Sequence, residues 1–265
     1  MNKPEYHQSR LKLYSRCPAS FKMAMSDIMP DIPKTTQATM DEGSLFEGYV
    51  LGFKEDKKED ELYGSKREAT KEKLKTQLMI QANHIRPLFL HPENSYVKLR
   101  HETSEYILAG EADNIGELDW DYLNKFTGEK YNKTEKSIND LKKTGSIGFV
   151  WAGLDKKINY LQAIMYVYIN YKNTREILPF IYIIIEDTYN KPIIKIKKIF
   201  IQDTDFIWLE TFINEVHNDL FYYPSTGFES CEGGRGKGRC WFLEQCQAGR
   251  NYIGGQERID FNSLI

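Results

Sequence analysis

The chain has 265 residues, of which 41% are hydrophobic and 13% aromatic, and its formal net charge is −2. This composition is typical of a globular chain with a buried core and excludes an intrinsically disordered one. The length suits one large domain, and we expect residues 1–265 to form it. The nearly balanced charge excludes a globally basic nucleic-acid-coating protein, so any nucleic-acid site must be a local patch.

The sequence contains no apolar run long enough for a membrane-spanning helix, which needs about 18 such residues or more. The first residues, MNKPEYHQSR, are polar and hold no apolar signal core. We therefore expect a cytoplasmic protein, in which disulfides are disfavoured.

Helices dominate the predicted N-terminal part of the chain. Ser9 can cap a helix over residues 9–25, and Pro18 predicts a break in that helix after Cys17. The other predictions here are a loop at 27–39, a helix at 41–53, a solvated helical face or arm at the charge-rich 54–75, and a helical continuation at 76–92 that turns at Pro87 and Pro92.

A β-rich pattern follows. Residues 178–186, LPFIYIIIE, form an apolar run of the kind found in a central buried strand. The order of elements predicts one α/β domain, with a core at about residues 40–220 and a mixed central sheet flanked by helices. The remaining predictions are strands at 95–100, 104–118, 136–142 and 192–201, helices at 154–171 and 203–220 (the latter capped by Asp203 or Thr204), and a hairpin tip at 119–134.

An acidic and lysine constellation is the strongest chemical signal. Asp140 and Lys142 lie two apart in a predicted strand, so they project from the same face. Asp113 and Asp140 are hard oxygen ligands for Mg²⁺ or Mn²⁺, and Glu47 could complete the metal shell directly or through water. Lys142 can orient a water and stabilise developing negative charge, as metal-dependent phosphodiester cleavage requires. The alternative is a surface ion pair, because Asp-x-Lys occurs by chance in a chain that is 28% charged.

Gln162 and Tyr166 lie four apart in the predicted helix 154–171 and therefore share one helical face. They could contact the metal shell or the scissile strand. The alternative is that Tyr166 belongs to the core with its neighbours Met165 and Ile169.

The four cysteines are Cys17, Cys231, Cys240 and Cys246. Their spacing lacks the two Cys-x-x-Cys pairs of a zinc ribbon. Four thiolates drawn from both ends of the chain could ligate an iron–sulfur cluster, which would tie the N-terminal helix to the C-terminal tail. Structural Zn²⁺ and four unrelated buried thiols stay open as alternatives.

The Gly-rich tail also carries a basic pattern. Arg235, Lys237 and Arg239 alternate with glycines. A backbone this open can wrap a phosphate while the cations neutralise it, so we predict a local DNA-binding patch.

Taken together, these residues resemble the motifs of RecB-like nucleases of the PD-(D/E)XK superfamily. The branch that the chain most resembles is that of the iron–sulfur exonucleases typified by the CRISPR-associated RecB-like exonuclease and the AddB nuclease domain. The residues that carry the resemblance are LYSRCPASF at 13–21, GSLFE at 43–47, Gly110 to Asp113, DLKKTG at 140–145, Gln162 to Tyr166, and Cys231, Cys240 and Cys246.

The resemblance implies a restriction-endonuclease-like core in which Asp113 and Asp140 bind Mg²⁺ or Mn²⁺ and Lys142 is the catalytic lysine. It also implies a [4Fe–4S] cluster on the four cysteines, joining residues 9–25 to the tail at 224–256. Two features depart from the pattern. Many relatives have His where Glu47 stands, and the stretch from Cys231 to Cys240 is longer than the usual Cys-x-x-Cys.

The expected function is a metal-dependent DNA exonuclease that acts on single strands or DNA ends, in recombination, repair or CRISPR adaptation. The abundance of Lys, Ile and Asn favours a phage or mobile-element enzyme. The alternative from another class is a non-catalytic module that binds nucleic acid or protein and holds Zn²⁺ or an iron–sulfur centre as a structural staple.

Overall fold

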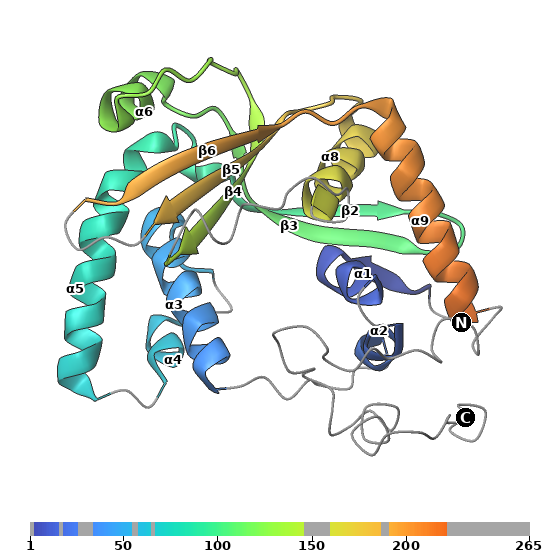
Figure 1. Cartoon of the computed structure of the whole chain (residues 1–265), viewed down its shortest axis with the longest axis horizontal. Helices are drawn as coiled ribbons and strands as arrows, with labels where there is room; N and C mark the ends of the chain where they lie inside the picture. Colours follow the sequence, from blue (N-terminus) through green and yellow to red (C-terminus); the bar gives the residue numbers. More distant parts are fainter. Residues whose placement is uncertain are drawn as a thin grey trace.

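A computed structural model describes residues 3–15, 18–25, 34–54, 58–64, 67–145, 160–186 and 191–221 (Figure 1). Its strands are β1 (Glu5–His7), β2 (Ser95–Glu102), β3 (Ile107–Gly116), β4 (Ser137–Thr144), β5 (Phe180–Glu186) and β6 (Ile193–Ile199). Its helices are α1 (Gln8–Tyr14), α2 (Pro18–Met25), α3 (Lys34–Leu51), α4 (Glu59–Tyr63), α5 (Glu68–Ile85), α6 (Trp120–Thr127), α8 (Leu161–Thr174) and α9 (Asp203–Phe221), with 3₁₀ turns at Arg86–Leu88 and Pro92–Asn94.

The strands form one six-stranded mixed sheet. Their order is β1-β3-β4-β5-β6, and β2 pairs with β3 beside this path. The pairs β1/β3 and β4/β5 are parallel, whereas β2/β3, β3/β4 and β5/β6 are antiparallel. The predicted α/β class with a mixed central sheet flanked by helices is therefore confirmed.

Strand β5 shows how the sheet divides two layers of core. Successive side chains of a strand point to opposite faces. Phe180, Tyr182 and Ile184 accordingly join the core on one face, and Ile181, Ile183 and Ile185 join the core on the other. Each fully buried side chain of this size stabilises the fold by about 1.5–3 kcal/mol. The continuous apolar run thus corresponds to a strand that is buried on both faces, as predicted.

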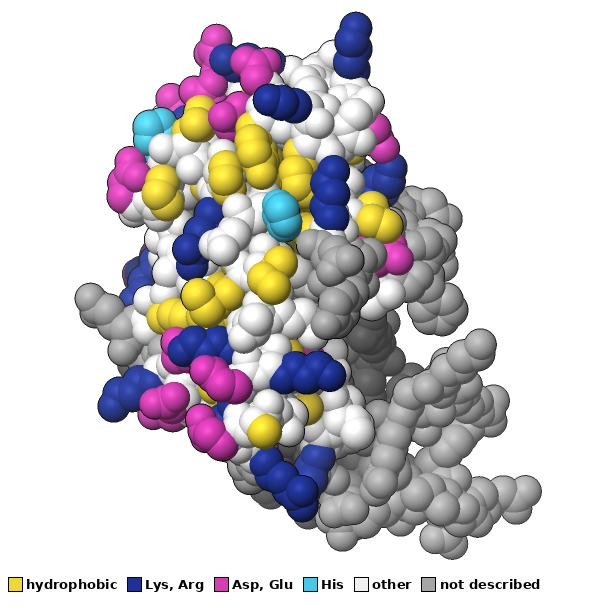
Figure 2. All heavy atoms as spheres, turned by 90° about the vertical axis from the view of Figure 1, so that its left-hand side faces the viewer, with side chains coloured by type: hydrophobic (Ala, Val, Ile, Leu, Met, Phe, Trp, Pro, Cys, Tyr) yellow, Lys and Arg dark blue, Asp and Glu magenta, His cyan; other side chains and the backbone are white. Residues whose placement is uncertain are grey.

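The helices divide between these two faces. One core contains residues of α1, α2, α8 and α9, and the other contains residues of α3, α4, α5 and α6. In Figure 1, α5 and α6 lie at the left of the molecule, and α1, α2 and α9 lie at the right. Figure 2 looks onto the left side, where apolar side chains gather in the middle of the face and charged side chains surround them. Met79 and Ile80 of α5 are among the exposed large apolar residues.

Several predicted elements hold with shifted ends. Strands β2, β4, β5 and β6 and helices α8 and α9 match their predicted ranges to within a few residues at most described ends. The predicted break in the first helix is also confirmed, because α1 ends at Tyr14 and α2 begins at Pro18, a position that tolerates proline since the first helical N–H has no partner. Residues 154–159 of the predicted helix lie outside the described residues.

Two predictions in the N-terminal third are wrong, and one strand was missed. Ser9 does not cap α1, because the helix begins at Gln8 and His7 occupies the cap position without a side-chain hydrogen bond. Helix α3 begins at Lys34, so residues 34–39 are helical and not part of a loop. Strand β1 was not predicted, because three residues are too few to show a period of two.

The predicted hairpin tip at 119–134 is also wrong, since it contains helix α6. The Asp119 side chain accepts a hydrogen bond from the Tyr122 backbone N at 2.8 Å, which caps the N-terminus of the helix. Gly128 ends the helix with a left-handed φ of 74°. Trp120 and Leu123 are buried in the core. These capping signals are present in the sequence and identify the helix.

Among the described residues, no helix is both long enough and apolar enough to cross a membrane.

Candidate active site

Strands β3 and β4 are paired along only a short part of their length. Their register pairs Asn114 with Asn139, Ile115 with Ile138 and Gly116 with Ser137. Beyond these pairs β3 continues beside β2, and β4 continues beside β5. The two strands therefore separate next to Asp113 on one side and Asp140 on the other, which places these two acidic residues at the point of separation.

The Asp113 carboxylate bridges the separated strands. Its Oδ2 accepts a hydrogen bond from the Leu141 backbone N at 2.7 Å. A side-chain oxygen of β3 thus satisfies a backbone donor of β4 at the place where the strand ladder has ended. This contact holds the Asp113 carboxylate beside the β4 residues that flank Leu141.

Asp140 and Lys142 form a close ion pair on β4. The Lys142 Nζ lies 2.6 Å from the Asp140 Oδ2, and the two side chains share one strand face, as predicted. The Asp140 side chain is only 1% exposed, whereas that of Lys142 is 36% exposed. The pair is therefore not an ordinary surface ion pair, because its carboxylate lies inside the protein.

Helix α8 holds the other oxygen of Asp140. The Gln162 Nε2 donates a hydrogen bond to Asp140 Oδ1 at 2.6 Å. The Asp140 Oδ2 is ion-paired with the Lys142 ammonium, but it makes no hydrogen bond of favourable geometry with any described residue. One oxygen is thus fixed by an amide, and the other is left for a cation. The prediction that Gln162 reaches the carboxylate site agrees with this placement.

The charges of the site shift one another's pKa. Burial raises the pKa of Asp113 well above its ordinary value, and the neighbouring Asp140 carboxylate raises it further. Burial also raises the pKa of Asp140, against the opposing effects of Lys142 and Gln162. Burial lowers the pKa of Lys142, but the carboxylates of Asp140 and Asp113 outweigh it and leave that pKa raised. The ammonium is therefore held in its charged form between two carboxylates that repel each other.

The donor set fits a hard divalent cation. Mg²⁺ is commonly bound by one or two carboxylates, with waters and substrate phosphates completing its shell. Asp113 and Asp140 supply two such carboxylates close enough to repel each other, which a bound cation would relieve. No group of three or more His, Cys, Asp or Glu residues converges within the described part of the chain, so the protein would contribute only part of the shell.

Glu47 lies beside Lys54, within electrostatic reach of Asp113. Its Oε1 lies 3.7 Å from the Lys54 Nζ, and the same ammonium is hydrogen-bonded to Glu111. Glu47 is near enough for its charge to raise the pKa of Asp113, but it does not join Asp113 and Asp140 in a three-residue donor group. Its role as a direct metal ligand stays a prediction.

Sequence reasoning missed Lys54 and Tyr96 at this site. The Lys54 ammonium lies 4.4 Å from the centroid of the Tyr96 ring, and the Tyr96 hydroxyl donates to the Gly52 carbonyl at 2.7 Å. Tyr96 has a positive φ of 55°, which is rare for a bulky residue, and Gly52 has a φ of 96°. Lys54 is the first residue of the charge-rich run 54–75, and the composition of that run is typical of a solvated arm. Only Gly52, two residues before Lys54, signals the turn that precedes it.

Tyr166 is a core residue that shapes the site. Its side chain is buried, and its ring lies so close to Gly110 that a Cβ there would be 2.4 Å from the Tyr166 Cε1. The Tyr166 hydroxyl accepts a hydrogen bond from the Glu111 backbone N at 3.4 Å. Burial raises the pKa of Tyr166 to about 12, which keeps the phenol protonated. Tyr166 thus packs against β3, one helical turn from the Gln162 contact with Asp140.

The remaining predicted site residues lie outside the described residues. These are the four cysteines, Cys17, Cys231, Cys240 and Cys246, and the basic residues Arg235, Lys237 and Arg239. The cysteine-ligated cluster and the basic tail patch therefore stay predictions.

Comparison with known proteins bears on the fold. No family model matches the chain, and no curated protein matches it. The chain is similar to a protein from Eubacterium rectale, described with its 2.19 Å crystal structure as a "putative exonuclease". The TM-score is 0.53 at 16% identity, and the match covers 99% of this chain and 93% of that chain. The crystal structure of SSO0001 gives a TM-score of 0.39 at 14% identity, over 94% of this chain and 88% of that chain. At 16% identity, the first likeness shows a shared fold.

Proposed function

We propose that the protein is a metal-dependent deoxyribonuclease that hydrolyses phosphodiester bonds at the site of Asp113, Asp140 and Lys142. The observation that carries the proposal is the pair of Lys142 with the buried Asp140 carboxylate, which lies beside Asp113 where two strands separate. A structural staple does not need an ammonium held in charged form between two carboxylates that repel each other. Metal-assisted cleavage of a polyanion uses both features.

When bound by Asp113 and Asp140, Mg²⁺ or Mn²⁺ would supply Lewis-acid polarisation of a phosphoryl oxygen and a more acidic water. Lys142 acts as a fixed positive charge, because its raised pKa makes it a poor general base. Its ammonium orients the attacking water and stabilises negative charge that develops on the phosphate. Gln162 holds the orientation of the Asp140 carboxylate through the 2.6 Å hydrogen bond to Oδ1.

The preferred substrate in this proposal is single-stranded DNA or a DNA end. The fold shared with the Eubacterium rectale protein supports an exonucleolytic mode, because that protein is described as a "putative exonuclease". We assign the protein to DNA recombination, repair or CRISPR adaptation, as its resemblance to RecB-like nucleases implies. The proposal also keeps the [4Fe–4S] cluster on the four cysteines, with Zn²⁺ as the alternative. A brown anaerobic preparation that loses its colour in Cys240→Ser would support the cluster.

The decisive experiment measures degradation of end-labelled single-stranded DNA with Mn²⁺. It compares the native protein, the native protein with EDTA, Asp140→Asn and, as a matched control, Asp121→Asn. Asp121 is an exposed carboxylate of α6, so its loss should leave cleavage unchanged. We expect cleavage only by the native protein and Asp121→Asn in the presence of metal. Equal cleavage by Asp140→Asn would refute the assigned site. A folded native protein that binds DNA without cutting it would instead support the non-catalytic module.

A further inference from the structure

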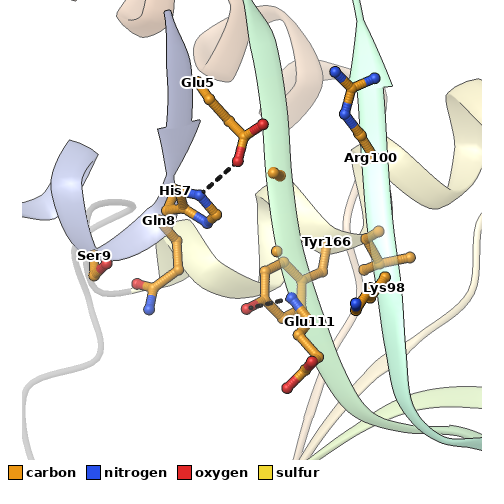
Figure 3. Close-up of a pocket in the computed structure, with 11 residues that line it drawn as sticks. Glu5, His7, Gln8, Ser9, Lys98, Arg100, Glu111 and Tyr166 are labelled. Atoms are coloured by element: carbon orange, nitrogen blue, oxygen red, sulfur yellow. Dashed lines mark hydrogen bonds and ion pairs between the residues drawn. The ribbon is translucent and has the colours of Figure 1, made fainter. Parts of the chain in front are cut away.

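A hollow of about 390 Å³ lies between the N-terminal segment and the β2/β3 part of the sheet (Figure 3). Glu5, His7, Gln8 and Ser9 of β1 and α1 line one side of it. Lys98 and Arg100 of β2, Gly110 and Glu111 of β3, and Tyr166 of α8 line the rest. A hollow of this volume is in the range of small-ligand sites, so it is too small to enclose a duplex.

The hollow adjoins the candidate active site. Tyr166 and Glu111 line it, and the hydrogen bond between the Glu111 N–H and the Tyr166 hydroxyl, drawn in Figure 3, forms part of its wall. Glu111 is also bound to Lys54, and Tyr166 lies one helical turn from Gln162, which binds Asp140. A chain-like molecule in the hollow therefore has a short path to Asp113 and Asp140.

Two cations of β2 face this hollow. Lys98 lies opposite Glu111 and Arg100 lies opposite Ala109 in the β2/β3 register, so all four side chains project from one face of the sheet. Lys98 and Arg100 are both exposed. Their Cα atoms are about 6.8 Å apart, since an antiparallel strand rises by ~3.4 Å per residue. Two cations at this spacing can contact two different phosphates of one strand.

The acidic residues that line the hollow have partners of their own. Glu5 forms a hydrogen bond of 2.9 Å with the His7 ring, and Glu111 is paired with the Lys54 ammonium. Arg100 gives one hydrogen bond, at 3.0 Å, to Glu102, and its guanidinium retains further donors. Lys98 makes no hydrogen bond or ion pair with any other described residue. The hollow thus has cationic groups to offer to an anionic ligand.

We propose that this hollow binds the backbone of a single-stranded nucleic acid next to the cleavage site, with Lys98 and Arg100 each neutralising one phosphate. Gln8 and Ser9 supply uncharged hydrogen-bonding groups on the opposite side of the strand. This inference rests on the proposed nuclease function, because it names the path by which the substrate of that site enters. It places the substrate contact on β2, far along the chain from the basic tail residues.

The test is a binding measurement that needs no cleavage. Fluorescence anisotropy of a labelled oligothymidylate is followed in EDTA over a range of salt concentrations, for the native protein and for the double variant Lys98→Ala/Arg100→Ala. Each phosphate contact with a single strand contributes about 0.7 to the slope of log affinity against log salt. We expect the double variant to lose about 0.7–1.4 of that slope, which corresponds to roughly 5- to 25-fold weaker binding at 0.1 M salt.

The matched control is Lys73→Ala/Lys125→Ala. These exposed lysines belong to α5 and α6, at the left of Figure 1, away from the elements that line the hollow. The control should keep the native affinity and slope. Circular dichroism checks that both double variants are folded.

The possible results separate the inference from the proposed function. If Lys98→Ala/Arg100→Ala keeps the native affinity and salt slope, or if the native protein does not bind the strand, the path is wrong. The path is also wrong if inorganic phosphate competes as well as the oligonucleotide at equal phosphate concentration, because the hollow would then be a free-phosphate site. If the native protein binds the strand but does not cut it, the proposed function fails. The salt slope of the double variant still shows whether the strand lies along Lys98 and Arg100. With Mn²⁺, the double variant should raise KM about 5- to 25-fold and keep kcat near the native value.

Discussion

The contact between Gly110 and Tyr166 gives a quantitative test of how the site is built. An alanine Cβ at position 110 would lie 2.4 Å from the Tyr166 Cε1, 2.9 Å from its Cζ and 3.2 Å from its Cδ1. Ordinary van der Waals contact begins at 3.4 Å, so the ring would have to move by 1.0 Å. The ring is buried and lies 6.2 Å from the Phe180 ring, so it cannot move without disturbing the core.

Gly110→Ala should therefore behave as an overpacking mutation. Such changes cost about 1–3 kcal/mol, and we expect the free energy of unfolding to fall by that amount. Movement of the ring should also break the hydrogen bond from the Glu111 N–H to the Tyr166 hydroxyl. Urea unfolding, with the midpoint and slope fitted separately, measures the effect.

The matched control for Gly110→Ala is Gly43→Ala. Gly43 lies inside α3, and no atom stands within 4 Å of its added Cβ. The same change should stabilise the protein there by about 0.5–1 kcal/mol, because alanine favours a helix. In a Tyr166→Ala background the Gly110→Ala cost should largely disappear. A Gly110→Ala variant as stable as the native protein, or the same cost in both backgrounds, would refute the reasoning.

Three further predictions concern the neighbouring residues. Asp113→Asn should increase the free energy of unfolding at neutral pH in EDTA, because the raised pKa of Asp113 means that its ionisation destabilises the fold. Urea unfolding at a series of pH values measures this gain in stability. The gain should vanish as the pH falls below the ordinary carboxyl pKa of 3.8. Gln162→Ala should lower metal affinity or kcat roughly 10- to 100-fold, since Asp140 loses its orienting hydrogen bond. Cleavage rates measured over a metal titration give both quantities. Native values of both would contradict the role assigned to Gln162. Asn139→Leu should destabilise the fold by about 1–3 kcal/mol for each buried polar atom it leaves without a hydrogen bond, and a neutral result by thermal unfolding would count against it.

The sequence predicts the sheet better than it predicts the approach to the site. Strand β5 and the Asp140–Lys142 spacing are local patterns, and a period of two is enough to find them. The burial of Asp140 and its hydrogen bond from Gln162 of α8 arise from the packing of elements far apart in the sequence. Lys98 and Arg100 alternate with apolar neighbours as in any solvent-facing strand. Their significance arises only when the segment that contains β1 closes the other side of the hollow.

The uncharged residues next to the acidic pair explain how the fold tolerates two repelling carboxylates. Asn139 donates to Asn114 Oδ1 at 3.0 Å and accepts from the Ser137 hydroxyl at 2.8 Å, and all three side chains are buried. A shift of the register by one residue would turn these side chains to the opposite face and leave their amides unpaired. The amide contacts therefore hold the register that brings Asp113 and Asp140 together. The buried amides thus fix the strand register, and the adjacent carboxylates are the groups to which the proposed function assigns the cation.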